Sequence, residues 1–220
     1  LRGIGEPKII ANIQNNEDEI IVSTDESWKV GDGPLIFNNL YLGERIDNRL
    51  YKENWNLVDF DDDDWTQAII DNSKKGELVL SHIPKIKRKR TLKPTSIIEN
   101  CRGNLLVDFT ETLSGVINIA FKGIEGKHIK LIYAEDVNDS NEVDCTSTLV
   151  GHVGMYLKEA DITFTGGAGA PKMAAQQDEI IAISGLNQYT NKFTYHSFRY
   201  VEISGLSKED LIDIEATYVY

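Results

Sequence analysis

The chain has 220 residues, of which 41% are hydrophobic and 26% charged, so it can bury the core of one large domain or two small ones. Its net charge of −12 argues against nucleic acid and anionic membranes as partners, because both require clustered lysines and arginines. No apolar run approaches the roughly 20 residues of a membrane span. A neutral ligand such as a sugar fits this charge.

Alternation of apolar and polar residues dominates the chain and predicts half-buried β-strands. In chain order the alternating sets are residues 9–13, 105–109, 117–121 and 129–133. Glycine turns follow each other at short spacing, and Gly123 with Gly126 predicts a hairpin or meander from residues 115–121 to 128–134. Many short strands with frequent turns are typical of a β-sandwich or jelly roll.

Helical patterns are scarce in the sequence. Residues 65–71 predict a short helical turn after an aspartate run, and residues 208–211 predict another with Ser207 as its N-cap. Residues 178–183 are apolar and β-branched, which favours a strand. Residues 136–177 are irregular, and we expect a long loop excursion that contains strands at 155–158 and 161–165.

The basic cluster from Lys85 to Lys93 has two readings, an electrostatic patch or a solvated linker or exposed strand, and we favour the second. It meets Pro94, where a domain boundary is expected. Two cysteines are too few for a disulfide framework, which leaves either one bridge between Cys101 and Cys145 or two free thiols, and we favour the free thiols. No signal peptide is visible, and a start at Leu1 rather than Met indicates a fragment or a processed form.

The usual catalytic signatures are absent from the sequence. We find no phosphate-binding loop, no GxGxxG, no HExxH and no GxSxG, and the four histidines lack metal-ligand spacing. An EF-hand calcium loop that started at Asp59 would place Asp64 and Ile70 where glycine and glutamate are required. The 35 acidic residues do not single out a catalytic pair of the glycosidase kind.

Several motifs in order resemble the β-domains that precede the catalytic barrel in bacterial α-L-rhamnosidases. No single motif is decisive, and their order along residues 24–203 carries the resemblance. They are TDESWKV at 24–30, GPL at 33–35, NNLYLGERIDNR at 38–49, Trp55 with FDDDDW at 60–65, LKP at 92–94, VDF at 107–109, YAE at 133–135, and FTYHSFRYVEI at 193–203.

The chain also departs from this family pattern. The family's DFGQNxAGW corresponds to residues 108–116, where Thr110 replaces its first glycine, and Ser197 replaces the glycine of YHGFRY. A change of phase near Ser197 predicts a bulge in the strand 193–203, and His196 and Arg199 are expected to need polar partners inside the fold. The family's first jelly roll also begins upstream of Leu1.

The resemblance implies an all-β fold with two β-sandwich or jelly-roll units. The first, residues 1–93, is an incomplete jelly-roll-like, carbohydrate-binding-like segment, and the second, residues 94–220, is a sandwich with the loop excursion 136–177. The inverting acid and base of the family are glutamates on the (α/α) barrel, expected beyond Tyr220. We therefore expect a non-catalytic accessory region of a bacterial glycoside hydrolase, cytoplasmic or exported, that scaffolds the barrel of the same polypeptide.

Two alternatives remain open, a module that binds rhamnose-containing glycans and a structural sandwich without a sugar ligand. The resemblance implies calcium-assisted rhamnose binding in this region for some members of the family, so no cofactor is expected apart from calcium, for which Asn38, Asn39 and Glu44 are the candidates. Asn39 lacks the charge of an aspartate, which weakens calcium affinity. A packed turn with Trp28 and Tyr41 in the core is the competing structural interpretation. The sugar-site candidates are Asn38, Asn39, Glu44, Asp47 and Arg49, with Trp55 or Trp65 as the aromatic platform.

Overall fold

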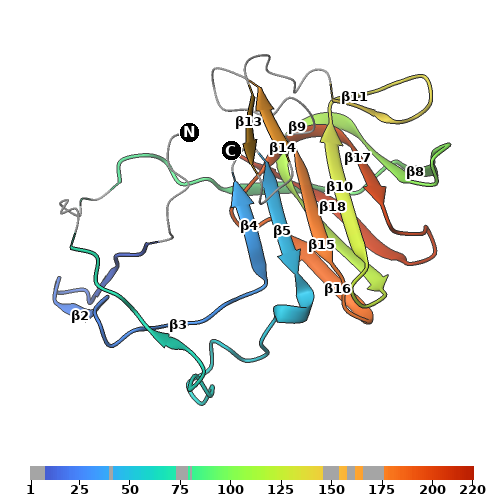
Figure 1. Ribbon diagram of the computed structural model, residues 1–220. Coiled ribbons are helices and arrows are strands. Elements are labelled where there is room, and N and C mark those ends of the chain that lie inside the picture. Colours follow the sequence, from blue (N-terminus) through green and yellow to red (C-terminus); the bar gives the residue numbers. More distant parts are fainter. Residues whose placement is uncertain are drawn as a thin grey trace. The chain divides into compact units, whose positions relative to one another are not determined.

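The structure is a computed structural model that describes residues 8–39, 42–72, 79, 81–145, 154–157, 162–165 and 176–220 (Figure 1). These residues form strands and one short 3-10 helix, so the all-β prediction is confirmed. No helix within these ranges is long and apolar enough to cross a membrane. The chain divides into two compact units, Leu1–Gly33 with Lys52–Pro84 and Pro34–Tyr51 with Lys85–Tyr220.

The first unit contains two short antiparallel pairs. Strand β1 (Asn12–Gln14) pairs with β2 (Ile20–Ser23), and β3 (Lys29–Val30) pairs with β6 (Thr66–Gln67). The strand expected at 9–13 thus starts later, and it is exposed rather than half-buried. The helical turn expected at 65–71 is wrong, because the backbone there pairs with β3 and continues to Ala68, whose N–H binds the carbonyl of Trp28 at 2.8 Å.

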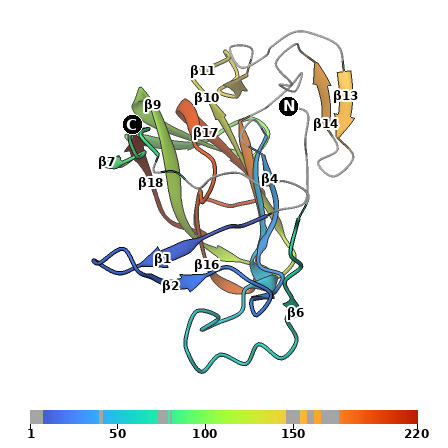
Figure 2. The same ribbon diagram turned by 90° about the vertical axis from the view of Figure 1, so that its left-hand side faces the viewer.

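The second unit is built on one ten-stranded sheet (Figures 1 and 2). Its main path runs β4-β5-β15-β10-β17-β9-β18-β7, and β8 and β16 also pair with β9. Every pairing is antiparallel except β5 with β15. The strands are β4 (Leu35–Asn39), β5 (Gly43–Asp47), β7 (Arg88–Leu92), β8 (Ser96–Glu99), β9 (Leu105–Gly123), β10 (His128–Ala134), β15 (Gln177–Ile181), β16 (Gly185–Thr190), β17 (His196–Ser204) and β18 (Leu211–Val219).

The sheet curls back on itself and encloses the core. Strand β16 pairs with β9, yet the Tyr189 hydroxyl on β16 donates to Glu44 on β5, far along the strand order. Figure 2 shows β4 and β9 on opposite sides of the curl. The buried side chains between them include Leu105, Ile117, Phe121, Ile129, Leu131, Tyr133, Ile180, Phe198, Val201 and Ile203. Each aliphatic or aromatic side chain buried in this way contributes about 1.5–3 kcal/mol.

The long strand β9 corrects the predicted hairpin. Residues 105–109 and 117–121 are parts of one 19-residue strand, in which Thr110 has a positive φ of 73°. Strand β10 does not pair with β9, because β17 lies between them in the sheet. Residues 118–123 of β9 pair instead with β16, which the sequence pattern did not predict.

The remaining elements agree more closely with expectation. Strand β15 covers most of the strand expected at 178–183. Within the excursion 136–177, β11 (Asp136–Val137) pairs with β12 (Val143–Asp144), and β13 (Gly154–Leu157) pairs with β14 (Ile162–Thr165). The last two strands confirm those expected there, although Lys158 and Asp161 lie outside the described residues. The helix expected at 208–211 is a turn, with Ser207 Oγ accepting from the Asp210 N–H at 3.3 Å.

Ion pairs hold the basic cluster at the edge of the sheet. Residues 88–92 form the edge strand β7, in which Arg90 pairs with Glu111 at 2.7 Å, and the following Lys93 pairs with Asp213 at 2.7 Å. The exposed-strand interpretation is therefore confirmed for these residues. Cys101 and Cys145 do not form a disulfide with each other, in line with the favoured expectation. The contact-based units do not follow a single cut in the chain, and the domain boundary at residues 93–94 stays a prediction.

Candidate functional site

A buried glutamate anchors a polar cluster inside the second unit. Glu44 lies on β5 and is only 2% exposed. Its Oε1 accepts the backbone N–H groups of Lys192 at 3.0 Å, Phe193 at 2.5 Å and Thr194 at 2.9 Å. Hydrogen bonds to a carboxylate are stronger than neutral ones, and they offset the cost of removing the carboxylate from water. Glu44 thereby fixes the loop between β16 and β17.

Asp178 on the neighbouring strand β15 extends this network. Its Oδ1 accepts the Glu44 N–H at 2.8 Å, and its Oδ2 accepts the Tyr133 hydroxyl at 2.5 Å and the Asn191 amide at 2.7 Å. His196 Nε2 lies 3.1 Å from the same oxygen. Burial by itself raises the pKa of Asp178, but the attraction of His196 and the hydrogen bonds outweigh it, so the pKa lies below its usual value.

Asn191 and two tyrosines complete the cluster. The Asn191 side-chain oxygen accepts the N–H of Ile117 at 3.0 Å. Ile117 lies on β9 between the residues that pair with β16 and those that pair with β17. The ring of Tyr133 stacks on His196 with centroids 4.2 Å apart. Burial, together with the nearby Asp178, raises the pKa of both Tyr133 and Tyr189, so each hydroxyl remains a donor. These contacts join β5, β9, β10, β15 and β17 through side chains.

Gly43 makes the position of Glu44 possible. Its φ is +77°, and a Cβ at this site would lie 1.7 Å from the carbonyl oxygen of Gln177. Only glycine lets β5 approach β15 so closely in this left-handed conformation. Gly43 and Glu44 therefore act together, since the glycine brings β5 close to β15 and the glutamate binds the loop between β16 and β17.

A second ion pair lies at an irregular point of the sheet. Arg199 binds both oxygens of Asp108 at 2.9 Å, and this hydrogen bonding lowers the pKa of Asp108. The ladder between β17 and β9 shifts register between Phe198 and Tyr200, close to the bulge expected near Ser197. Arg199 and His196 both have polar partners within the fold, which confirms that expectation.

The structure divides the sequence-predicted sugar-site residues between the two units. Asn38 is exposed on β4, opposite Glu44 in the ladder, and Asn39 is half-buried. Asp47 is buried, and its carboxylate accepts the Arg49 Nε–H at 2.8 Å, which lowers the pKa of Asp47. The same carboxylate accepts the backbone N–H of Arg49 at 3.0 Å and so caps η1 (Asn48–Leu50). All five predicted polar residues thus belong to the hairpin β4–β5 and its end.

The two predicted platform residues belong to the first unit. Trp55 is 53% exposed, whereas Trp65 is half-buried and packs against Phe60 with ring centroids 5.6 Å apart. Trp28 is half-buried, and its indole N–H donates to the carbonyl of Ser23 at 3.2 Å. Tyr41 lies outside the described residues. Among the residues that the structure describes, no three His, Cys, Asp or Glu side chains are grouped to hold a metal ion.

Sequence reasoning missed most of the buried cluster. Asp178 stands before an apolar run, and an acidic residue at the start of a buried strand is the signal that could have identified it. Asn191, Tyr189 and Thr194 carry no such signal, because each of them binds a residue that is 70 or more positions away in the chain. Donors of the fold itself bind the carboxylates of Glu44 and Asp178, so the cluster orders the strands and the loop around it.

The curled sheet and its internal polar cluster define a β-sandwich protein, and comparison with known proteins gives its family. The concanavalin-like domain of bacterial α-L-rhamnosidases matches residues 99–220, and the α-L-rhamnosidase N-terminal domain matches residues 3–90. The chain therefore belongs to the bacterial α-L-rhamnosidase family.

Individual relatives agree with this assignment. An α-L-rhamnosidase of Formosa agariphila is 29% identical over 198 residues, which are 89% of this chain and 19% of the relative. The structure of an α-L-rhamnosidase from Dictyoglumus thermophilum matches with a TM-score of 0.72 and 31% identity, over 93% of this chain and 21% of that one. A Streptomyces avermitilis α-L-rhamnosidase complexed with L-rhamnose shares the fold, with a TM-score of 0.74 at 20% identity over 95% and 18% of the two chains. The chain spans about a fifth of the length of these relatives.

Proposed function

We propose that this chain is the non-catalytic accessory region of an inverting α-L-rhamnosidase-type glycoside hydrolase and that it scaffolds the catalytic (α/α) barrel of the same polypeptide. The observation that carries the proposal is the pair of family matches, which follow each other in order and occupy nearly the whole chain. The relatives are about five times as long, which leaves room for a separate catalytic domain.

The buried polar cluster supports a scaffolding role. Glu44 and Asp178 are held by backbone and side-chain donors of the fold, so these two buried carboxylates of the second unit serve its own architecture. A rigid sandwich is what a scaffold requires, because a satisfied buried network specifies one arrangement of the strands.

Hydrolysis of an aryl α-L-rhamnoside tests the proposal directly. The 220-residue chain is expected to give no turnover above the rate in buffer, whereas the complete parent polypeptide is expected to hydrolyse the substrate. Turnover by the 220-residue chain alone would contradict the proposal, and so would a parent polypeptide that lacks a helical barrel.

A rhamnose-binding module is the second candidate, because Trp55, one of the two predicted platform residues, is 53% exposed. Calorimetric titration with L-rhamnose, with and without calcium, is the test. Absence of heat at millimolar sugar would reject the module and, with a glycan array free of hits, leave a sandwich without a sugar ligand.

A further inference from the structure

Two exposed aromatic side chains project from the loop that Glu44 fixes. Phe193 is 70% exposed and Tyr195 is 43% exposed, while Thr194 and His196 between and beside them are buried. Exposed and buried residues alternate from Phe193 to His196, so the two aromatic rings both lie on the exposed side of the loop. Free aromatic rings on a surface lose the stabilisation that burial gives, and rigid ones are typical anchors of interfaces.

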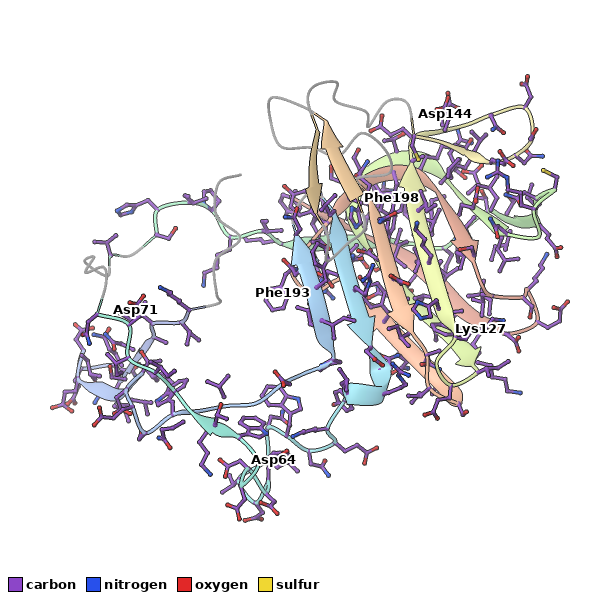
Figure 3. The ribbon with its side chains drawn as sticks, in the orientation of Figure 1. Asp64, Asp71, Lys127, Asp144, Phe193 and Phe198 are labelled. Atoms are coloured by element: carbon purple, nitrogen blue, oxygen red, sulfur yellow. The ribbon has the colours of Figure 1, made fainter. Side chains whose placement is uncertain are left out.

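The hydrogen bonds to Glu44 keep this loop in one conformation. Three consecutive N–H groups bind the same carboxylate, so the backbone beneath the rings is ordered before any partner arrives. Preordering lowers the entropy cost of binding. Because Asn38 on β4 is the ladder partner of Glu44, the loop lies beside the hairpin β4–β5, and Figure 3 shows Phe193 beside β4.

Strand β4 is an end of the ten-stranded sheet, and its sequence Leu-Ile-Phe-Asn-Asn has no charge. No strand among the described residues pairs with its outer side. The opposite end, β7, carries Arg88, Lys89 and Arg90, and such charges protect an edge from unwanted pairing. One edge strand of the sheet is thus protected by charges and the other is not, which indicates that β4 is normally covered. We name Phe193, Tyr195 and β4 together the aromatic edge.

We propose that the aromatic edge is the surface on which this region docks to the catalytic domain of its own polypeptide. The inference rests on the proposed function, because it requires that domain. The relatives support a tethered partner, since the region matched here is one fifth of a longer chain in each of them. The size of the surface also favours a tethered partner over a separate protein. Two rings and one strand fall short of the roughly 20–30 residues per side of an interface between separate proteins. A tethered domain needs less, because the linker raises its effective concentration.

Hydrogen–deuterium exchange on the parent polypeptide and on the 220-residue chain tests this docking. The β4 amides are the readout, because the loop amides are already bonded to Glu44. We expect them to exchange at least about tenfold more slowly in the parent polypeptide. The double variant Phe193→Ala/Tyr195→Ala is expected to abolish that difference in the parent while leaving the unfolding midpoint of the 220-residue chain unchanged. Leu186→Ala, an equally exposed apolar position on β16, is the matched control and is expected to preserve the difference.

The possible results separate this inference from the proposed function. Equal β4 exchange in both proteins, with an active parent, overturns the docking surface and leaves the accessory role intact. A parent without a catalytic domain overturns both. Slow exchange that is already present in the dilute 220-residue chain, or that depends on its concentration, shows coverage by the chain itself or by a second copy. Slow exchange that appears only with added L-rhamnose identifies a sugar ligand. Each of these last results overturns the docking proposal.

Discussion

The carboxylate of Glu44 lies 2.9 Å from the backbone N–H of Thr194, although 150 residues separate the two in the chain. The contact joins the second strand of the sheet to the loop between β16 and β17. It links a residue of the matched N-terminal domain, 3–90, to the matched concanavalin-like domain, 99–220. The hairpin β4–β5 is therefore an integral part of the second compact unit, as its contacts also show.

Replacing Glu44 with glutamine should destabilise the second unit. The amide keeps the size of the carboxylate but loses its charge, and one of its two ends becomes a donor that faces N–H groups. We expect the free energy of unfolding in urea to fall by about 2–4 kcal/mol. Glu179→Gln, on the adjacent strand β15, is the matched control. Its partners, the exposed His128 and the half-buried Arg45, keep contact with solvent, which predicts a loss of about 1 kcal/mol or less. Similar losses in both variants would contradict the anchoring role of Glu44.

The lowered pKa values of Asp178 and Asp108 predict a loss of stability in acid. A carboxyl group whose folded pKa lies below its unfolded value, about 3.9, contributes stability above that value. The contribution is lost as the pH falls through the folded pKa. We therefore expect the unfolding midpoint to be level from pH 7 to about 5 and to drop steeply below pH 4. Asp178→Asn should make the profile flatter below pH 4, and an unchanged slope would show that other groups dominate.

The strained residue Thr110 offers a stabilising substitution. Its φ of 73° is unfavourable for a β-branched residue, and it occupies the position where the family motif has glycine. We expect Thr110→Gly to raise the free energy of unfolding by about 1 kcal/mol, reduced in part by loss of the hydrogen bond to Thr95 Oγ1. Thr110→Ala removes the same hydrogen bond and keeps the Cβ, so it should be destabilising. Glycine and alanine variants of equal stability would show that φ strain is negligible here.

Local patterns predicted the strands well but not their partners. Alternation located β10 and the sets within β9, because one face of each strand packs against the core, and apolar, β-branched composition located β15. It did not predict that β17 separates β9 from β10, since pairing depends on contacts between residues far apart in the chain. In the candidate site, too, a local motif predicted the residue but not its partners. Glu44 was identified from a motif, but its role depends on a loop near residue 193, which no local pattern connects to it.

Two glycine substitutions separate close packing from backbone strain at the Glu44 anchor. Gly43 and Gly185 both have positive φ values, of 77° and 89°. A Cβ at Gly43 would overlap the carbonyl oxygen of Gln177, whereas a Cβ at Gly185 would meet no atom within 4 Å. Gly185→Ala therefore carries only the conformational cost, about 1–2 kcal/mol. Gly43→Ala must also push β5 away from β15.

We therefore expect Gly43→Ala to cost at least about 3 kcal/mol in urea unfolding and to expose the amides of Lys192, Phe193 and Thr194 to exchange. The exchange is informative because those amides depend on Glu44, which moves with β5 when the strands separate. In Gly185→Ala the same amides should stay protected, since Glu44 keeps its place. If both variants lost equal stability and kept these amides protected, the close approach of β5 to β15 would not be what positions Glu44.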